Sequence, residues 1–353
     1  MAAVGLMALA KTTSDYDLAG SARSKYTEAV HMVNSALQSP ERSRDDTTLM
    51  SVISLGVFEE ISDYKSWVLH VQGAAALLVA RGRGQFSSSI SLKLFNQVRT
   101  DLITACVNED KPVPDEILRL QEAGSAHPEA SGSFWRIGML GVRCAQLLTK
   151  FKGYSIGLAT HLLAESDVLQ HDFVTAGQSL MLEEPYSTIH DVAGHPDLVC
   201  GGKIGAYSDV WSIRIWNNWR NLLMIVCRIK CFLLNEVLKH ALGPDSVNHL
   251  KVERHGTLQL LSQLGEDILA TAPQVTAFQV GGSPGKGEQD VAPALSHVAG
   301  AYLLAGRFSI VGQSEATSRE TRQWIIKRLQ HISDTARIPT AVKIIQDIEA
   351  AEA

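Results

Sequence analysis

Apolar residues recur at the spacing of an α-helix along nearly the whole chain. Tyr26, Val30, Val33 and Leu37, for example, fall on one face of a helix with about 3.6 residues per turn. Strand-like composition is confined to the short segment QVTAFQV at residues 274–280. The sequence therefore predicts an all-α fold of about 10 to 13 packed helices, with little or no strand.

The chain is long enough to bury a large hydrophobic core. It has 353 residues, of which 45% are hydrophobic and 20% are charged, as in ordinary globular proteins. We expect a single large helical domain over residues 1–353, with lobes at about 1–124 and 133–353. The polar segment SAHPEASG at 125–132 is the predicted linker, and GGSPGKGEQD at 281–290 is a predicted flexible loop.

The charge balance and the apolar runs exclude several classes of protein. The net charge is −5, whereas a surface that binds nucleic acid needs clustered Lys and Arg. No apolar run is long enough to span a bilayer. The apolar N-terminal stretch is short and follows no basic residue, unlike a secretory signal. We therefore expect neither a membrane span nor secretion.

The cysteine and histidine patterns do not predict a metal site. The five cysteines are scattered and include no Cys-x-x-Cys pair, so neither a disulfide framework nor a zinc site is expected. The segment IHDVAGHPD at 189–197 contains two His and two Asp, but at no standard ligand spacing, and we expect a solvated loop there. The sequence thus indicates no metal and no cofactor.

Two motifs in the loop 281–290 resemble catalytic signatures but lack essential parts. GGSPG has the spacing of a nucleophile elbow, yet the residue after Ser283 is Pro284, which has no N–H for an oxyanion hole. The pair Gly285-Lys286 lacks both the earlier Gly and the following Ser or Thr of a phosphate loop. Neither motif predicts catalysis.

The stretch SDYKSWVLHVQGAAALLVARG at residues 62–82 places an acid and an imidazole on one helix face. Asp63, Trp67 and His70 stand at i, i+4 and i+7. A lone His in an apolar helix is usually a core residue with a hydrogen-bond partner. The alternative is that His70 and Asp63 form a catalytic acid–base pair.

The segment YSDVWSIRIWNNWRNLLMIVCRIK at residues 207–230 is the richest in aromatic residues. Trp211, Ile215 and Trp219 are spaced by four and are predicted to share a helix face, with Trp216 and Arg220 close by. Such a stripe is usually core, but it can also line an apolar ligand cavity. Both interpretations stay open at this point.

Residues along most of the chain resemble a known family, more specifically in the first hundred positions and more loosely after residue 110. The early motifs are KYTEAVHMVNSALQSPERSRDDTTLMSVISLGVFEEI and, after it, SWVLHVQGAAALLVARG. The later ones are VWSIRIWNNWRNLLMIVCRIK and TRQWIIKRLQHISDTARIPTAVKII. The chain resembles the fungal-specific transcription factor domain, the regulatory region of zinc-binuclear-cluster transcription factors. The positions that match the family pattern are Trp67, His70, Gly73, Ala74, Arg81 and Gly82. Members carry a six-cysteine zinc cluster that binds DNA, and no such cluster occurs in this sequence, so we expect no direct DNA binding by this chain.

The resemblance implies a regulator in the nucleus, or otherwise in the cytoplasm, that controls fungal secondary metabolism. Its partners would be a small hydrophobic effector and other proteins or a second copy of the chain. The effector would contact Trp67, His70, Trp211, Trp216, Trp219 and Arg220. The alternative is an enzyme of the same fold, a cofactor-independent cyclase or isomerase acting on a hydrophobic metabolite, with His70 and Asp63 as catalytic residues.

Overall fold

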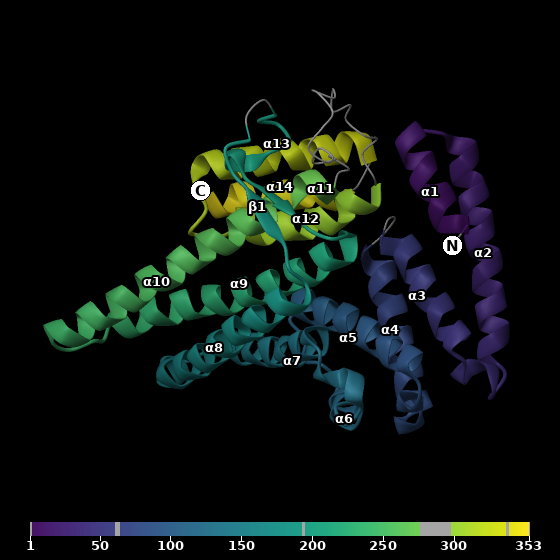
Figure 1. The fold of residues 1–353 in the computed structure, drawn as a ribbon, viewed down its shortest axis with the longest axis horizontal. Helices are drawn as coiled ribbons and strands as arrows, with labels where there is room; N and C mark the ends of the chain where they lie inside the picture. Colours follow the sequence, from purple (N-terminus) through teal and green to yellow (C-terminus); the bar gives the residue numbers. More distant parts are fainter. Residues whose placement is uncertain (1, 61–63, 193–194, 276–297, 337–338, 353) are drawn as a thin grey trace. The chain divides into compact units, whose positions relative to one another are not determined.

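The fold is all-α, as the helical periodicity predicts. The computed structural model describes residues 2–60, 64–192, 195–275, 298–336 and 339–352. In this part of the chain, helices α1 to α14 account for the regular structure, apart from 3₁₀ turns and one small two-stranded sheet (Figure 1). The chain divides into two compact units, Met1–Thr149 and Lys150–Ala353, called unit 1 and unit 2 below.

Each of the first four helices of unit 1 packs against the next helix in the sequence. Short connections join them, so they lie side by side as hairpins (Figure 1). The sixth helix contacts the fourth. The helices and 3₁₀ turns are α1 (Ala2–Thr13), α2 (Tyr16–Leu37), η1 (Arg42–Arg44), α3 (Asp46–Glu60), α4 (Tyr64–Arg81), η2 (Arg83–Ser87), α5 (Ser89–Glu109), α6 (Asp115–Gly124), η3 (Pro128–Ser131) and α7 (Ser133–Lys152), which extends into unit 2.

Local signals fix where these helices begin and end. Asp15 caps α2, because its carboxylate accepts hydrogen bonds from the first backbone N–H groups of that helix. Ser88 caps α5 in the same way. Gly82 follows the last residue of α4 with φ +64°, a left-handed conformation that costs glycine little and stops the helix.

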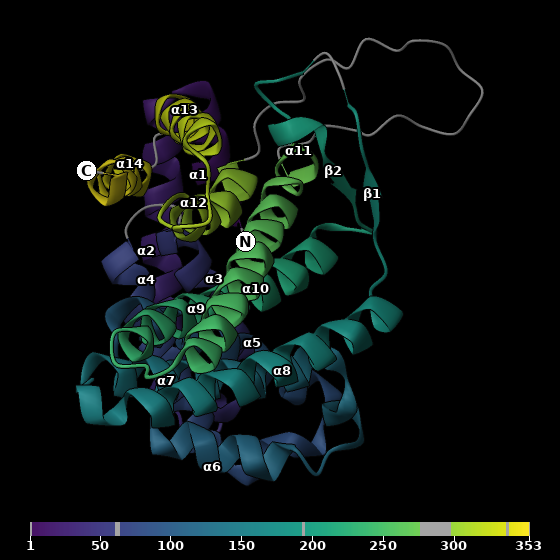
Figure 2. The same cartoon turned by 90° about the vertical axis from the view of Figure 1, so that its left-hand side faces the viewer.

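Unit 2 is organised around one long buried helix, α9. More than half of its residues are buried, and it contacts α8, α10 and α12. Figures 1 and 2 both show α10 running alongside α9. The elements are η4 (Ile156–Leu158), α8 (Ala159–Glu183), β1 (Ser187–Ile189), η5 (Cys200–Gly202), β2 (Ile204–Ala206), α9 (Val210–Leu238), α10 (Pro244–Leu269), α11 (Ala272–Val275), α12 (Val298–Gly312), α13 (Arg319–Ala336) and α14 (Pro339–Glu352).

The strands lie elsewhere than the sequence suggests. β1 and β2 pair antiparallel between α8 and α9, whereas the described start of QVTAFQV, Gln274–Val275, is helical because it ends α11. The predicted linker 125–132 lies inside unit 1, where it forms η3. The predicted loop 281–290 lies outside the described residues. No helix in the described ranges is long and apolar enough to cross a membrane.

Candidate functional site

The small sheet of unit 2 brings two tyrosines together. Ser187 pairs with Ala206, so the residues just outside this pair, Tyr186 and Tyr207, face each other across the hairpin. Their rings stack with centroids 4.6 Å apart and planes 17° from parallel. Figure 2 shows the hairpin beside α11, and Gln274 of α11 holds the Tyr207 backbone with two hydrogen bonds of 2.9 Å.

Arg220 of α9 lies against this tyrosine pair. Its Nη2 donates to the Tyr207 hydroxyl at 2.7 Å and its Nη1 to Oδ1 of Asn217 at 3.1 Å. The guanidinium carbon is 5.1 Å from the Tyr186 ring, 5.6 Å from the Tyr207 ring and 5.2 Å from the Trp216 ring. The cation is thus enclosed by three aromatic rings, which attract it through their negative faces. We call Arg220, Tyr186, Tyr207 and Trp216 the aromatic cage.

The charge of the aromatic cage is not balanced by an acid. Arg220 is 0% exposed, yet within the described residues no carboxylate lies within ion-pair distance of it. Its Nε has no hydrogen-bond partner there either. Burial raises the pKa of Tyr207, so the phenol is neutral and supplies no compensating charge. A buried, unpaired cation is costly, so this cluster is a candidate site for an anionic group.

The predicted tryptophans divide between packing and exposure. Trp216 donates to the Glu184 carbonyl at 2.8 Å, and Trp219 donates to the Phe173 carbonyl at 2.7 Å, so both indole N–H groups are already satisfied. Trp219 also fills the space over Gly177, where a Cβ would come within 2.4 Å of its ring. Trp211, by contrast, is 44% exposed and has the Arg214 guanidinium over its ring. Trp216 therefore belongs to the cage, and Trp219 packs behind it.

The two remaining predicted site residues, Trp67 and His70, lie in unit 1. Trp67 is buried in α4, and His70 is half-buried with its Nε2 2.9 Å from the Tyr26 hydroxyl of α2. Burial lowers the pKa of His70, and Glu59 opposes that effect. Glu59 also interacts with Tyr26, whose pKa is raised mainly by burial. Asp63 lies outside the described residues, so its predicted pairing with His70 stays a prediction.

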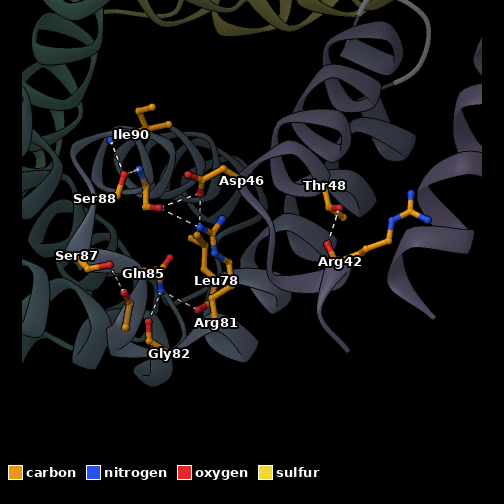
Figure 3. A network of polar contacts seen from close by, with 12 residues as sticks. Arg42, Asp46, Thr48, Leu78, Arg81, Gly82, Gln85, Ser87, Ser88 and Ile90 are labelled. Atoms are coloured by element: carbon orange, nitrogen blue, oxygen red, sulfur yellow. Dashed lines mark hydrogen bonds and ion pairs between the residues drawn. The ribbon is translucent and has the colours of Figure 1, made fainter. Parts of the chain in front are cut away.

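A second polar network in unit 1 involves the family-pattern residues Arg81 and Gly82. The Arg81 side chain is 6% exposed and pairs with Asp46 of α3 and, at 3.1 Å, with Ser91 of α5 (Figure 3). Ser91 donates to the same carboxylate at 2.8 Å. Burial would raise the pKa of Asp46, but hydrogen bonds from Arg81 and Ser91 hold it below its usual value. The network joins α3, α4 and α5.

Helix α3 passes next to His70 at Gly56, where an added Cβ would make ordinary van der Waals contacts. A Cβ on Gly56 would lie 3.4 Å from the His70 Cβ and 3.9 Å from the Trp67 ring, so α3 approaches α4 at this point. Tyr26 stacks on Phe58 at 4.4 Å. Trp67 and His70 therefore mark the packing of α2, α3 and α4.

A comparison with known protein families finds a match in the first part of the chain. Residues 1–105 match the model of the fungal specific transcription factor domain. This segment, less than a third of the chain, is similar to that family. The match covers Trp67, His70, Arg81 and Gly82, and it confirms the resemblance inferred from the sequence. No curated protein and no solved structure matches the chain.

The fungal transcription factor segment and the aromatic cage lie in different units. Sequence reasoning identified Trp216 and Arg220 and found Tyr207 in the same aromatic segment, although not as a site residue. It missed Tyr186, because the pairing of β1 with β2 brings this residue to Tyr207 and the arginine. A Tyr on each side of a Gly- and Pro-containing segment was the available signal. In the described ranges, no group of three or more His, Cys, Asp and Glu side chains is placed to hold a metal ion.

Proposed function

We propose that this chain is a transcription regulator that senses a small effector at the aromatic cage of unit 2. A transcription-factor-like regulatory role follows from the family match of residues 1–105. The proposed effector is an apolar or aromatic molecule with one anionic group. The proposed location is the nucleus, and the proposed targets are genes of fungal secondary metabolism.

The observation that carries this proposal is the unbalanced charge of Arg220. The guanidinium is fully buried and has two oxygen partners, a phenol and an amide, but no carboxylate among the described residues. An anion at this point would meet a cation in a medium of low dielectric constant, where charge–charge attraction is much stronger than in water. A guanidinium also binds carboxylates with paired hydrogen bonds, and its Nε is without a partner here.

The apolar part of the proposed effector would contact the rings of the cage. Trp216 and Tyr207 are buried, whereas Tyr186 is only half-buried and is held by ring contacts with Tyr207 and Trp216. Entry would require the Tyr186 ring to move, because Arg220 itself is not accessible. Tyr186 adjoins β1, so its displacement would alter the hairpin and could shift a surface recognised by other proteins.

The regulatory role is tested by replacing Arg220 in the chromosomal gene of the organism that encodes this protein. We expect the Arg220→Met allele to change the transcript levels of the target genes when it is compared with wild type at matched protein levels. The matched control is Arg214→Met, which removes the partly exposed arginine beside Trp211 on the same helix. Transcript levels that are unchanged in both a deletion strain and the Arg220→Met strain would contradict regulation.

The enzymatic alternative depends on His70 and gives a different result in the same strains. His70 is within hydrogen-bond distance of Tyr26, and Glu59 lies beside that tyrosine, so three titratable groups are close together. Proton transfer to a substrate would require His70 to release Tyr26. Accumulation of a precursor with unchanged transcripts, in a deletion strain and in a His70→Gln strain, would favour the enzyme over the regulator.

A further inference from the structure

The outward face of α4 lacks the charged residues that a solvent-facing helix normally carries. Between Lys65 and Arg81, the sequence SWVLHVQGAAALLVA contains no Lys, Arg, Asp or Glu. Leu69 is 67% exposed and Val79 is 41% exposed. The other exposed positions on this helix between those two are Gln72, Gly73 and Ala76. Exposed apolar residues grouped on one face mark a surface that another element covers.

The exposed residues have the spacing of a helix–helix seam. Leu69, Gln72, Ala76 and Val79 are separated by three, four and three residues, the pattern that faces a partner helix in coiled coils. Gly73 lies beside this seam, and a Cβ at that position would meet nothing within 4 Å. A second backbone can therefore approach closely at the middle of the helix.

An apolar depression extends the seam toward α6. Its volume is ≈ 200 Å³, and its lining includes Ala76 and Val79 of α4 and Pro114 and Ile117 at the start of α6. Glu116 also lines it, and Asp115 is adjacent in the first turn of α6. Acidic residues thus lie next to the Val79 end of the seam.

The charges at the two ends of the seam are opposite. Lys65 lies at the start of α4, and Asp115 and Glu116 lie near its far half. A surface with a cation at one end and anions at the other is complementary to a copy of itself turned by 180°. The Glu116–Arg119 pair at 3.2 Å is exposed on both sides and weak, so it does not prevent such a contact.

We propose that α4 binds α4 of a second copy of this chain, antiparallel, about a two-fold axis at Gln72. In this register Lys65 of one copy faces Val79 and Glu116 of the other, and Leu69 faces the depression. This inference concerns unit 1 and does not depend on the proposed effector. The contact from Lys65 to Val79 spans about 15 residues, or roughly 22 Å, so the interface is small and a dissociation constant on the order of tens of micromolar is expected.

Sedimentation velocity on the full chain over a concentration series tests the dimer. Wild type should dimerise as the concentration approaches about 100 µM, and Leu69→Glu should weaken dimerisation by about tenfold or more. The matched control is Met32→Glu on α2, because Met32 is 64% exposed and also lies in unit 1. This control should dimerise like wild type.

A charge exchange tests the antiparallel arrangement. Lys65→Glu and Glu116→Lys should each weaken the dimer several-fold, and the double variant should restore it, since each copy then carries the exchanged pair. Failure of the double variant to restore dimerisation would overturn the proposed orientation.

Cysteine crosslinking tests the position of the axis. In a Cys200→Ser background, the remaining native cysteines are buried. Gln72→Cys should form a disulfide-linked dimer under mild oxidation, because position 72 meets itself at the axis. Val79→Cys should not, because its two copies would lie about 21 Å apart, far beyond disulfide reach. A chain that stays monomeric throughout the series, or a Leu69→Glu variant that dimerises like wild type, would overturn the proposal.

Discussion

Helix α9 carries two buried cations, Arg220 and Lys230, which differ in the kind of partner that surrounds them. Lys230 pairs with Asp167 of α8 at 2.7 Å and with Glu253 of α10 at 2.8 Å. Burial alone would lower its pKa, but the two carboxylates outweigh burial and hold the pKa above its ordinary value. Arg220 is more deeply buried and, in the described part of the chain, contacts aromatic rings and neutral oxygens instead. Lys230 thus has two counter-ions, whereas Arg220 has none among the residues that the structure describes.

The difference separates a structural charge from a candidate binding charge. Lys230 connects three helices of unit 2, and its partners account for its burial. Arg99 in unit 1 is a useful third case, because it is also buried without a carboxylate, and burial lowers its pKa to about 9. Its guanidinium, however, has three oxygen partners and stacks 4.1 Å from the Trp135 ring. Arg220 has two oxygen partners and three aromatic rings, so both arginines differ from Lys230 in having no carboxylate partner among the described residues.

The largest expected loss of stability comes from replacing Lys230, the cation with two carboxylate partners. Lys230→Met leaves Asp167 and Glu253 close together without their cation. The free energy of unfolding should therefore fall by about 2–4 kcal/mol. Urea denaturation of the full chain measures this, with the exposed Lys239→Met as control. Adding Asp167→Asn and Glu253→Gln should recover much of the loss. A loss of stability no larger than in the control would contradict the assignment of Lys230 as a structural charge.

A smaller effect is expected at the unbalanced site. Arg220→Met removes two hydrogen bonds and leaves the Tyr207 hydroxyl without a donor, but it also removes a buried charge that lacks a counter-ion. The net loss of stability should be about 1–2 kcal/mol, less than for Lys230→Met. The same denaturation experiment ranks the two. If Arg220→Met loses more stability than Lys230→Met, Arg220 is the more important structural cation. That result would contradict the distinction drawn between the two residues.

The smallest effect is a difference in pH dependence between arginines. The Arg81–Asp46 pair lowers the pKa of Asp46 in the folded state, so its stabilisation is present above the unfolded pKa of about 3.9 and is lost as pH falls through the lower folded value. The stability cost of Arg81→Met should therefore shrink as pH falls below about 4. The cost of Arg220→Met should not change in that window, because Arg220 has no carboxylate partner in the described residues. A cost of Arg220→Met that also shrinks below about pH 4 would show that Arg220 does have an acidic partner.

The sequence predicted the helices well because their signals are local. The spacing of Trp211, Ile215 and Trp219 predicted a helix in the segment 207–230, and α9 spans Val210–Leu238. The spacing of Tyr26, Val30, Val33 and Leu37 also predicted a helix, and α2 spans Tyr16–Leu37. The hairpin was missed because β1 and β2 are three residues each and pair across a Gly- and Pro-containing segment, which carries no period to detect.

The candidate site was only partly predictable because its partners come from distant segments. Trp216 and Arg220 are recognisable as an aromatic and cationic group on one helix, but periodicity does not tell Trp216, which is buried, from Trp211, which is exposed. Tyr186 and Tyr207 reach Arg220 through strand pairing, and Asp167 and Glu253 reach Lys230 through the packing of α8 and α10. Which cation lacks a counter-ion is thus a property of the folded chain.

The most direct test of the central claim compares two ligands that differ in charge alone. Isothermal titration calorimetry on the full chain would use 2-naphthoate, an aromatic carboxylate, and 2-naphthamide, its neutral counterpart. Wild type should bind the carboxylate at least about tenfold more tightly than the amide, and Arg220→Met should lose that preference while Arg214→Met keeps it. No binding of either ligand, or an equal preference in wild type and Arg220→Met, would contradict an anion-sensing role for Arg220.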